Sequence, residues 1–401
     1  MQVWVVTALF YPEEVSTGYI TTCIAETLVE SAEVGVICGP SNYQSKALLA
    51  NFDLDPRIKI KRVSIPNLNK NNLFLRSVSL VLLTFGLIYK IILHVKKNDK
   101  VVVVTTPPTL IPIASFLKRL IGFKFVVIAH DVFPEILVPA GMFKKDSLVY
   151  KTLLNYFNYC YNRACRIIVI GEDVRKLFKR KLKNDLPVST ITNWADFDQI
   201  TPDHSMNLSK YYNENFDNKI CIQFAGNIGR VQGLETIFKI LVECTTSNFK
   251  LMIIGDGALK SKLIELKKSL NLNLVSFIGS KPRSEQTTFI NACDIGLVSI
   301  EAGMYGLAVP SKVYNIMAAG KPILYIGDAE TEISLYIKEF NVGWAFTWDK
   351  KNELKCFLEK LTTEFKSEIL EKGQNARNLV ERKFQKEQVL ELYRQDILRI
   401  E

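Results

Sequence analysis

The sequence is poor in histidine and has no clustered cysteines. Three histidines occur in 401 residues, and no two cysteines have the Cys-x-x-Cys spacing of zinc or dithiol sites. A zinc site with cysteine and histidine ligands is therefore not expected. Scattered cysteines in apolar runs are typical of reduced, buried thiols, which indicates a cytoplasmic compartment. The eight cysteines are Cys23, Cys38, Cys160, Cys165, Cys221, Cys244, Cys293 and Cys356.

Several other common signals are missing as well. The first eight residues are apolar, but they contain no basic segment and Pro12-Glu13-Glu14 follows, so we expect a first strand rather than a signal peptide. The longest apolar run, Ser77 to Tyr89, has thirteen residues. As a helix this run would be about 20 Å long, short of the roughly 30 Å core of a bilayer, so a transmembrane helix is not expected.

What is present is a globular composition with a strong positive charge. Hydrophobic residues make up 48% of the chain and charged residues 23%, and the formal net charge is +10. The length allows two or three domains. The charge indicates an anionic partner, which leaves a nucleotide, a nucleic acid or an acidic membrane surface. Because no basic motif interleaved with aromatics occurs, nucleic acid is not the expected partner.

Apolar strands alternate with helices along most of the chain, which predicts parallel sheets covered on both faces. The pattern stops in a polar, turn-rich stretch and then starts again. We therefore expect an α/β protein with two Rossmann-like, doubly wound domains that face each other across a cleft. Ligands of such sheets bind at the carboxyl ends of the strands. The predicted parts are an N-terminal domain over 1–195, a linker over 196–218, a second domain over 219–380 and a C-terminal helix over 381–401.

One stretch, Val309 to Pro322, has the pattern of a loop, a helix and a strand. Ser311 is a suitable N-cap, Gly320 is typical of a residue just beyond a helix end, and Lys312 lies in the first turn. The free N–H groups of such a helix end favour an anion, and the lysine adds a full charge. We interpret the anion as a diphosphate. The alternative is an ordinary helix docked on a sheet, with an exposed lysine.

Four further loops follow predicted strands and are candidates for chemistry. His130-Asp131 ends a buried strand. Gly226 to Gly233 contains three glycines and Arg230, which suits close approach of a phosphate. The loops Phe10–Gly18 and Phe277–Lys281 are the other two. Neither a GxGxxG fingerprint nor a P-loop is present. We interpret Gly255-Asp256-Gly257 as a tight turn, and the Asp-x-Asp matches at 53–55 and 196–198 as chance rather than metal sites.

Taken together, these motifs resemble the retaining glycosyltransferases of family 4, which have the GT-B fold, and in particular the bacterial fucosamine-transferase-like enzymes of O-antigen and capsule synthesis. The motifs are spread over most of the chain, and the set is more specific than any single member. They are Phe10–Glu13, His130–Glu135, Asn193–Asp196, Ala225–Gly229 with Gln232–Glu235, and Val309–Lys312 continuing through Ala318–Pro322.

The resemblance implies a metal-independent enzyme without a cofactor. It would transfer a sugar, with retention, from a nucleotide diphosphate sugar (UDP favoured) to a polyprenyl-diphosphate-linked glycan. The implied catalytic residues are His130, Arg230 and Lys312. The implied donor-binding residues are Gly226, Asn227, Gly229, Gln232, Ile278, Lys281, Gly306, Val309, Ser311 and Asn315. The implied acceptor-binding residues are Glu14, Gly18, Asp131 and Glu135, and the C-terminal helix is expected to pack back on the N-terminal domain.

The sequence departs from the family pattern at two sets of positions. Asn315 occupies the place of a glutamate that many members use, and the paired glutamate position is Leu307. Asn227 and Gln232 occupy places where arginine and lysine are usual, although Arg230 lies nearby. These differences support an alternative, in which the chain binds a nucleotide sugar or a lipid-linked glycan without catalysis.

A membrane-facing surface is also predicted. The apolar helix expected over Leu75–Val95 is bracketed by Arg76, Lys90, Lys96 and Lys97. Further basic residues flank apolar segments in the same half of the chain. A cationic, apolar face suits peripheral binding to anionic lipid at the inner face of the cytoplasmic membrane. The alternative is a core helix with solvated ends. The further basic residues are Lys118, Arg119, Lys124, Lys144 and Lys145.

Overall fold

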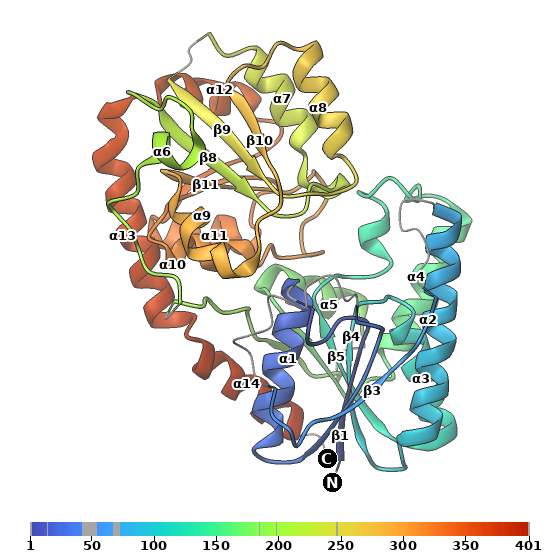
Figure 1. The fold of residues 1–401 in the computed structure, drawn as a ribbon. Coiled ribbons are helices and arrows are strands. Elements are labelled where there is room, and N and C mark those ends of the chain that lie inside the picture. Colours follow the sequence, from blue (N-terminus) through green and yellow to red (C-terminus); the bar gives the residue numbers. More distant parts are fainter. Residues whose placement is uncertain are drawn as a thin grey trace.

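A computed structural model of the chain describes residues 2–13, 15–41, 54–66, 73–183, 185–197, 199–245 and 248–399. It contains two parallel sheets, one in each half of the chain (Figure 1). This confirms the predicted pair of doubly wound α/β domains. Central strands such as β4 and β5 are rich in Val and Ile and are buried along nearly their whole length. This is the pattern expected of strands covered by helices on both faces.

The first sheet has seven strands in the order β3-β2-β1-β4-β5-β6-β7. Its strands are β1 (Gln2–Thr7), β2 (Glu33–Cys38), β3 (Lys59–Arg62), β4 (Lys100–Val104), β5 (Lys124–Ala129), β6 (Arg166–Val169) and β7 (Val188–Thr190). Its helices are α1 (Ser16–Val29), α2 (Leu73–His94), α3 (Leu110–Ile121), the 3₁₀ turn η1 (Glu135–Leu137), α4 (Leu148–Tyr161) and α5 (Glu172–Lys181).

The second sheet has six strands in the order β10-β9-β8-β11-β12-β13. Its strands are β8 (Ile220–Ala225), β9 (Phe249–Ile254), β10 (Val275–Ile278), β11 (Ile295–Ser299), β12 (Ile323–Ile326) and β13 (Gly343–Phe346). The helical elements of this half are α6 (Leu208–Tyr212), η2 (Arg230–Gln232), α7 (Leu234–Val242), α8 (Lys260–Ser269), η3 (Arg283–Glu285), α9 (Gln286–Asn291), α10 (Lys312–Ala318), α11 (Glu332–Phe340), α12 (Lys351–Lys360), η4 (Thr363–Phe365), α13 (Lys366–Lys383) and α14 (Lys386–Leu398).

Two local features differ from the sequence interpretation. Strand β13 was not anticipated, because its Gly-Trp-Ala-Phe sequence is too short to show a strand period. The segment interpreted as a linker contains α6, and Tyr212 and Phe216 are buried in a cluster with strand residues of the second domain. Only the first part of 196–218 therefore crosses between the two sheets.

Helix α2 is longer than the apolar run that suggested it. It has 22 residues, and its window Ser77–His94 is long and apolar enough to cross a membrane by length and composition. The expected helix over Leu75–Val95 is thus close to the observed one in length. The estimate of about 20 Å covered only the uninterrupted apolar run and left out Ile91 to Leu93, which follow Lys90. One side of α2 packs on the first domain through Leu87 and Ile91, and Val95 continues this packing just after the helix; all three are nearly inaccessible to solvent.

The end of the chain returns to the first domain, as Figure 1 shows for α14 beside α1. Arg166 and Asp396 form an ion pair of 2.7 Å, and the Tyr393 hydroxyl donates to the Ile191 carbonyl at 3.2 Å. Helix α13 precedes α14 and packs against α10 of the second domain. The two consecutive helices thus connect both domains.

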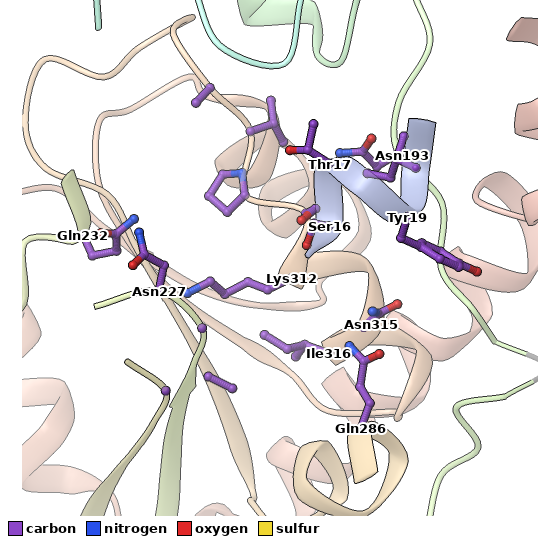
Figure 2. A pocket seen from close by; sticks show the side chains of 18 of the residues that line it. Ser16, Thr17, Tyr19, Asn193, Asn227, Gln232, Gln286, Lys312, Asn315 and Ile316 are labelled. Carbon is purple, nitrogen blue, oxygen red and sulfur yellow. The ribbon is translucent and has the colours of Figure 1, made fainter. Parts of the chain in front are cut away.

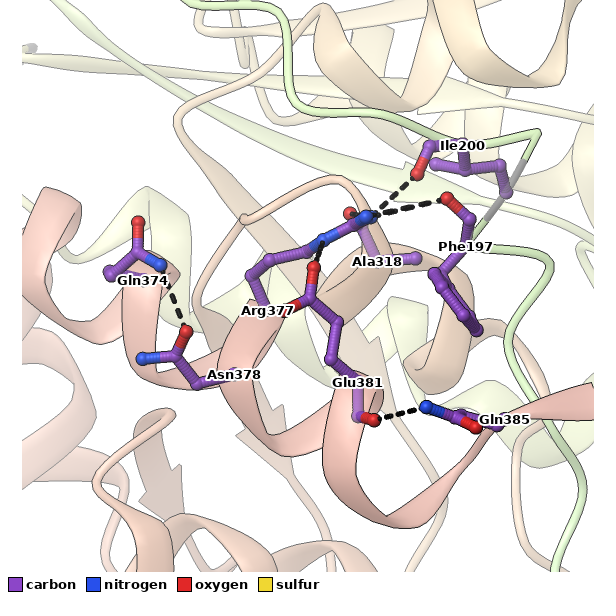
Figure 3. Close-up of polar contacts among 8 residues, drawn as sticks. All are labelled: Phe197, Ile200, Ala318, Gln374, Arg377, Asn378, Glu381 and Gln385. Atoms are coloured by element: carbon purple, nitrogen blue, oxygen red, sulfur yellow. Dashed lines mark hydrogen bonds and ion pairs between the residues drawn. The ribbon is translucent and has the colours of Figure 1, made fainter. Parts of the chain in front are cut away.

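A single arginine of α13 ties together the crossing segment and α10 (Figure 3). The Arg377 guanidinium donates to the carbonyls of Ile200 at 2.8 Å and Ala318 at 2.6 Å. Its Nε donates to Glu381 at 2.6 Å. Charged donors to buried carbonyls contribute more than neutral ones, because a carbonyl that loses its partner cannot regain water.

We expect Arg377→Met to lower the free energy of unfolding by roughly 2 kcal/mol, because it leaves these carbonyls unpaired. Chemical denaturation measures this change. Gln374→Ala, one turn away and engaged only in an exposed contact with Asn378 in Figure 3, is the matched control. It should change stability by less than about 0.5 kcal/mol. Equal effects of the two substitutions would contradict this role of Arg377.

Candidate functional site

A cavity of about 620 Å³ lies between the carboxyl ends of the two sheets. This volume is in the range of small-molecule sites, about 300–1,000 Å³. The order in which the chain adds strands to the second sheet reverses between β8 and β11, and the loops after both strands line the cavity. The site therefore lies at a topological switch point, where open α/β sheets bind their ligands.

The two walls of the cavity are joined by main-chain contacts. Asp131, directly after β5, forms an antiparallel bridge with Ala308, shortly before α10. Beside it, the Val132 N–H donates to the Leu307 carbonyl at 2.9 Å. These contacts place the predicted His130-Asp131 loop next to the predicted 309–322 stretch, although the two are far apart in the sequence.

Lys312, the first residue of α10, reaches into the cavity towards Asn227 (Figure 2). Its Nζ is buried and, among the described residues, has no hydrogen-bond partner. The amine instead lies over the face of the Phe224 ring, whose centroid is 3.5 Å from Nζ. A cation–π contact contributes less than an ion pair. Because the amine is buried away from water and no ion pair offsets the loss of hydration, the pKa of Lys312 is lowered to about 7.

The cavity is shaped to admit this amine. Gly226, after β8, has a φ of 141°, a conformation that favours glycine. A Cβ at this position would lie 3.3 Å from Lys312 Nζ. Ser311 occupies the N-cap position that the sequence predicted, but its side chain accepts no capping hydrogen bond. The Ser311 hydroxyl, which lines the cavity, is therefore not used to cap α10.

The other cations of the cavity are engaged with carboxylates. Lys281 forms an ion pair of 3.0 Å with Glu285. Arg283 forms an ion pair with Asp196, and its guanidinium lies 3.7 Å from the centroid of the Tyr19 ring. Lys312 is thus the cavity cation without a carboxylate partner among the described residues, and it is the group best placed to receive an anionic ligand.

His130 provides a neutral imidazole on the opposite wall. Its Nε2 is buried without a hydrogen-bond partner in the described part of the chain. Burial lowers the pKa of His130 to about 4 and raises the pKa of Asp131 to about 6. At neutral pH the imidazole is uncharged, so it can exchange hydrogen bonds with a sugar hydroxyl but does not add to the positive charge.

Ten of the residues implied by the resemblance line this one cavity. They come from both domains, as a cleft between donor and acceptor would require. The ten are His130, Asp131, Gly226, Asn227, Gln232, Lys281, Val309, Ser311, Lys312 and Asn315.

Arg230 is the main residue that the structure does not bring into the cavity. Its side chain is exposed at the start of η2, while the next residues, Val231 and Gln232, do line the cavity. The prediction placed Arg230 beside Lys312 from its loop alone. The direction of the side chain depends on η2, which the sequence pattern did not reveal.

The remaining predicted residues that the structure describes do not line the cavity. Glu135 forms an ion pair with Lys181. Gly306 lies at the contact between the domains, where a Cβ would be 2.9 Å from the Asp173 carbonyl. Gly18 is buried within α1, Gly229 donates its N–H to the Gln232 side chain at 3.0 Å, and Ile278 ends β10. Glu14 lies outside the described residues.

Several lining residues were missed. Asp196 had been set aside as part of a chance Asp-x-Asp match, yet it accepts from the Tyr19 hydroxyl at 2.6 Å and pairs with Arg283. Gly255 and Asp256 had been interpreted as a tight turn, but both line the cavity. No local signal links Asp196 to Arg283, because 87 residues separate them. The Asn193–Asp196 motif was the available clue.

Metal ligands do not gather in the described part of the chain. No group of three or more His, Cys, Asp or Glu side chains there is placed to hold a metal ion. Of the carboxylates that line the cavity, Asp196 is engaged with Tyr19 and Arg283, and Asp256 lies 3.7 Å from the Lys260 amine.

Comparisons with known proteins agree with this geometry. Residues 210–373 match the family described as "Glycosyl transferases group 1". The chain is also 35% identical to the probable glycosyltransferase WbjE of Pseudomonas aeruginosa. The match extends over 291 residues, which are 73% of this chain and 73% of the relative. This chain belongs to the group 1 glycosyltransferases. The glycosyltransferase resemblance is thereby confirmed at the level of the family, while the fucosamine-transferase-like branch stays a prediction.

This glycosyltransferase is similar to two further proteins, one in sequence and one in fold. It is 27% identical over 183 residues to the putative colanic acid biosynthesis glycosyl transferase WcaI of Escherichia coli K12, covering 45% of this chain and 44% of the relative. Its fold is similar to that of Anabaena HepE in complex with UDP and glucose, with a TM-score of 0.74, 16% identity and 99% of each chain covered. At this identity, the second similarity supports the GT-B fold alone.

The depressed pKa of Lys312 predicts a specific dependence of stability on pH. The pKa is about 7 in the folded glycosyltransferase, below its ordinary value of 10.5. The cost of burying the charge is thus fully present below pH 7 and disappears as the pH rises through 10.5. Without ligand, Lys312→Met should raise the free energy of unfolding by roughly 2 kcal/mol at pH 7 and by progressively less towards pH 10.5.

Denaturation at a series of pH values tests this expectation. Lys281→Met is the matched control, because this cavity lysine is exposed and paired with Glu285. It should change stability by less than about 1 kcal/mol at any pH. A Lys312→Met variant that is less stable than the wild type at pH 7 would show that the amine has a stabilising partner.

Proposed function

We propose that this glycosyltransferase transfers a sugar from a nucleotide diphosphate sugar, with UDP as the favoured nucleotide, to a polyprenyl-diphosphate-linked glycan. The observation that carries the proposal is the buried, unpaired Lys312 Nζ at the switch point of the second sheet. A diphosphate would supply the charge that this amine lacks. HepE, which shares the fold, is described in complex with UDP, which supports the same class of ligand.

In the proposed reaction, the second domain holds the donor. The loop after β8 approaches the diphosphate through Gly226, and Lys312 neutralises its charge. We propose that Ser280 and Lys281, after β10, lie near the base. Arg230 stays a candidate for the diphosphate, since Val231 and Gln232 beside it line the cavity. Asn315 takes the place of the usual ribose-contacting glutamate and can accept or donate a hydrogen bond to a hydroxyl.

The proposed chemistry is metal-independent and retains the anomeric configuration. The acceptor hydroxyl attacks the anomeric carbon on the face from which the diphosphate leaves. The bond between the anomeric carbon and the phosphate oxygen breaks, the new glycosidic bond forms, and the departing phosphate takes the hydroxyl proton. Lys312 stabilises the charge that develops on the leaving group, which is the electrostatic contribution expected to be large in a dry site. His130 positions the donor sugar.

The acceptor and the place of action are proposed on separate grounds. WcaI, which is similar to part of this chain, is named as a protein of colanic acid biosynthesis, which supports a role in bacterial surface polysaccharide such as O-antigen or capsule. An acceptor linked to a polyprenyl diphosphate would be anchored in the cytoplasmic membrane. We therefore place the enzyme in the cytoplasm, peripherally on the inner face of that membrane.

A non-catalytic binding protein is the second candidate. It is favoured by the absence of the glutamate pair: Leu307 is buried at the contact between the domains, and the Asn315 Oδ1 accepts from the Asp196 N–H at 3.4 Å. Such a protein would bind the nucleotide but release none from a nucleotide sugar in the presence of acceptor. Transfer assays separate the two candidates directly.

Calorimetric titration with UDP and with GDP in EDTA tests the nucleotide site. We expect UDP to bind without metal and at least about tenfold more tightly than GDP, a difference of about 1.4 kcal/mol. Lys312→Met should weaken UDP binding by at least about tenfold, because a charged hydrogen bond to the diphosphate is lost. As this variant is expected to be the more stable protein, a loss of binding cannot be assigned to misfolding. Binding of neither nucleotide would overturn the proposal.

Substitution of the cavity histidine tests catalysis separately from binding. His130→Ala should lower sugar transfer by about a hundredfold, because a positioned contact near the reacting carbon is lost, and leave UDP binding unchanged. The assay measures UDP release from a UDP-sugar in the presence of lipid-linked acceptor. His204→Ala, which replaces an exposed histidine of the crossing segment, is the control. Sugar transfer at the wild-type rate by both variants would contradict a role of His130 in catalysis.

A further inference from the structure

Exposed apolar side chains are concentrated on one part of the N-terminal domain. Among the described residues, nineteen large hydrophobic side chains are exposed, and fifteen of them lie on α2, α3 and the segment 142–161 that includes α4. We call these fifteen the apolar face. They are Phe74, Leu80, Val81, Leu82, Phe85, Tyr89, Ile92, Leu93, Phe116, Leu120, Met142, Leu148, Val149, Tyr156 and Tyr159.

Helix α2 presents two apolar sides. Leu87 and Ile91 are buried against the first domain, and a Cβ on Gly86 would lie 2.1 Å from a Val63 side-chain carbon. On the other side, Phe85 and Ile92 are 65% and 57% exposed. The 22 residues of α2 extend about 33 Å along the domain. The exposed apolar side therefore forms a straight edge of the domain that a flat surface could contact.

The helices that carry the apolar face are neighbours. Helix α3 contacts both α2 and α4, and Figure 1 shows the three along the same side of the first sheet. The hydroxyls of Thr84 and Thr109 lie 3.0 Å apart between α2 and the start of α3. Lys118 Nζ donates to the Arg163 carbonyl at 2.8 Å, which joins α3 to the end of α4. The helices that carry the apolar face are therefore packed side by side.

The charge around this surface has one sign. The sequences of α2, α3 and α4 contain no Asp or Glu. Six basic side chains are exposed on or next to these helices. In the segment 97–151, all of which the structure describes, Asp146 is the one exposed carboxylate. Pairing of two copies through this face would bring like charges together, whereas an anionic lipid surface would complement them. The six are Lys96, Lys97, Arg119, Lys144, Lys145 and Lys151.

We infer that α2, α3 and α4 form a docking face that lies flat on a bilayer containing anionic lipids, with the apolar side chains at the headgroup boundary. The apolar face also approaches the cavity. Ile136 lines the cavity, and the Met142 N–H donates to the carbonyl of the next residue, Leu137, at 2.9 Å. A lipid-linked acceptor would thus reach the cleft over the 137–149 segment. This route rests on the proposed function, whereas binding of the face to a bilayer does not.

Flotation with vesicles tests the docking face. The purified full-length chain should bind vesicles of phosphatidylethanolamine with about one third phosphatidylglycerol, and should bind pure phosphatidylcholine vesicles weakly. Phe85→Ser with Ile92→Ser should reduce binding to the anionic vesicles by at least about tenfold. The matched control is Leu370→Ser with Leu392→Ser, which changes two apolar side chains of similar exposure on α13 and α14. The control should bind as the wild type does.

Three outcomes would overturn the inference. One is equal binding of the two double variants to anionic vesicles. Another is a wild-type dimer in solution that the Phe85→Ser, Ile92→Ser variant converts to monomer, which would assign the face to a second copy. The third is resistance of the membrane-bound chain to extraction with alkaline carbonate, which would indicate that α2 spans the bilayer. UDP titration of the same variants should give wild-type affinity, so a failure of docking is distinguished from a failure of the nucleotide site.

Discussion

An amine buried without an anionic partner is costly, and the cavity of this glycosyltransferase is built around one. Lys312 begins α10 at the switch point of the second sheet, with the Phe224 ring beneath its Nζ and the backbone of Gly226 beside it. The neighbouring cations Lys281 and Arg283 are paired with carboxylates. Proteins keep such unpaired groups at functional sites, where a ligand supplies the missing charge. Gly226 leaves room beside the amine, and the other cavity cations are already paired, so an anionic ligand would bind at Lys312.

The topology of the two sheets explains how one cavity collects residues from distant parts of the chain. In parallel sheets the loops that follow the strands lie at one edge, and here these edges face each other. The bridge between Asp131 and Ala308 fixes the loop of the first domain against that of the second. The Asp196–Arg283 pair and the Tyr19 hydroxyl bind the crossing segment to both walls. A hinge motion of the domains would act on these contacts.

Much of this arrangement could be predicted from the sequence, because the strands are long Val and Ile runs and the loops after them carry distinctive residues. His130 and Lys312 were identified in this way. Contacts between distant residues could not be predicted: Arg283 has no local pattern that joins it to Asp196. The direction of Arg230 depends on η2, and the closeness of Gly255 to the Gly226 backbone depends on how β8 and β9 pair. The apolar span of α2 was underestimated because Lys90 interrupts the apolar run without ending the helix.

The central claim is that Lys312 is held as a partnerless amine until a diphosphate binds. Nuclear magnetic resonance of the chain with ¹³C-labelled lysine side chains, with Lys312→Met to assign the signal, measures the pKa of this amine directly. The account predicts a pKa near 7 in the free protein and a return to about 10 or above when UDP is bound, because the diphosphate favours the charged form. A Lys312 signal that titrates near 10.5 without ligand, or that does not respond to UDP, would contradict it.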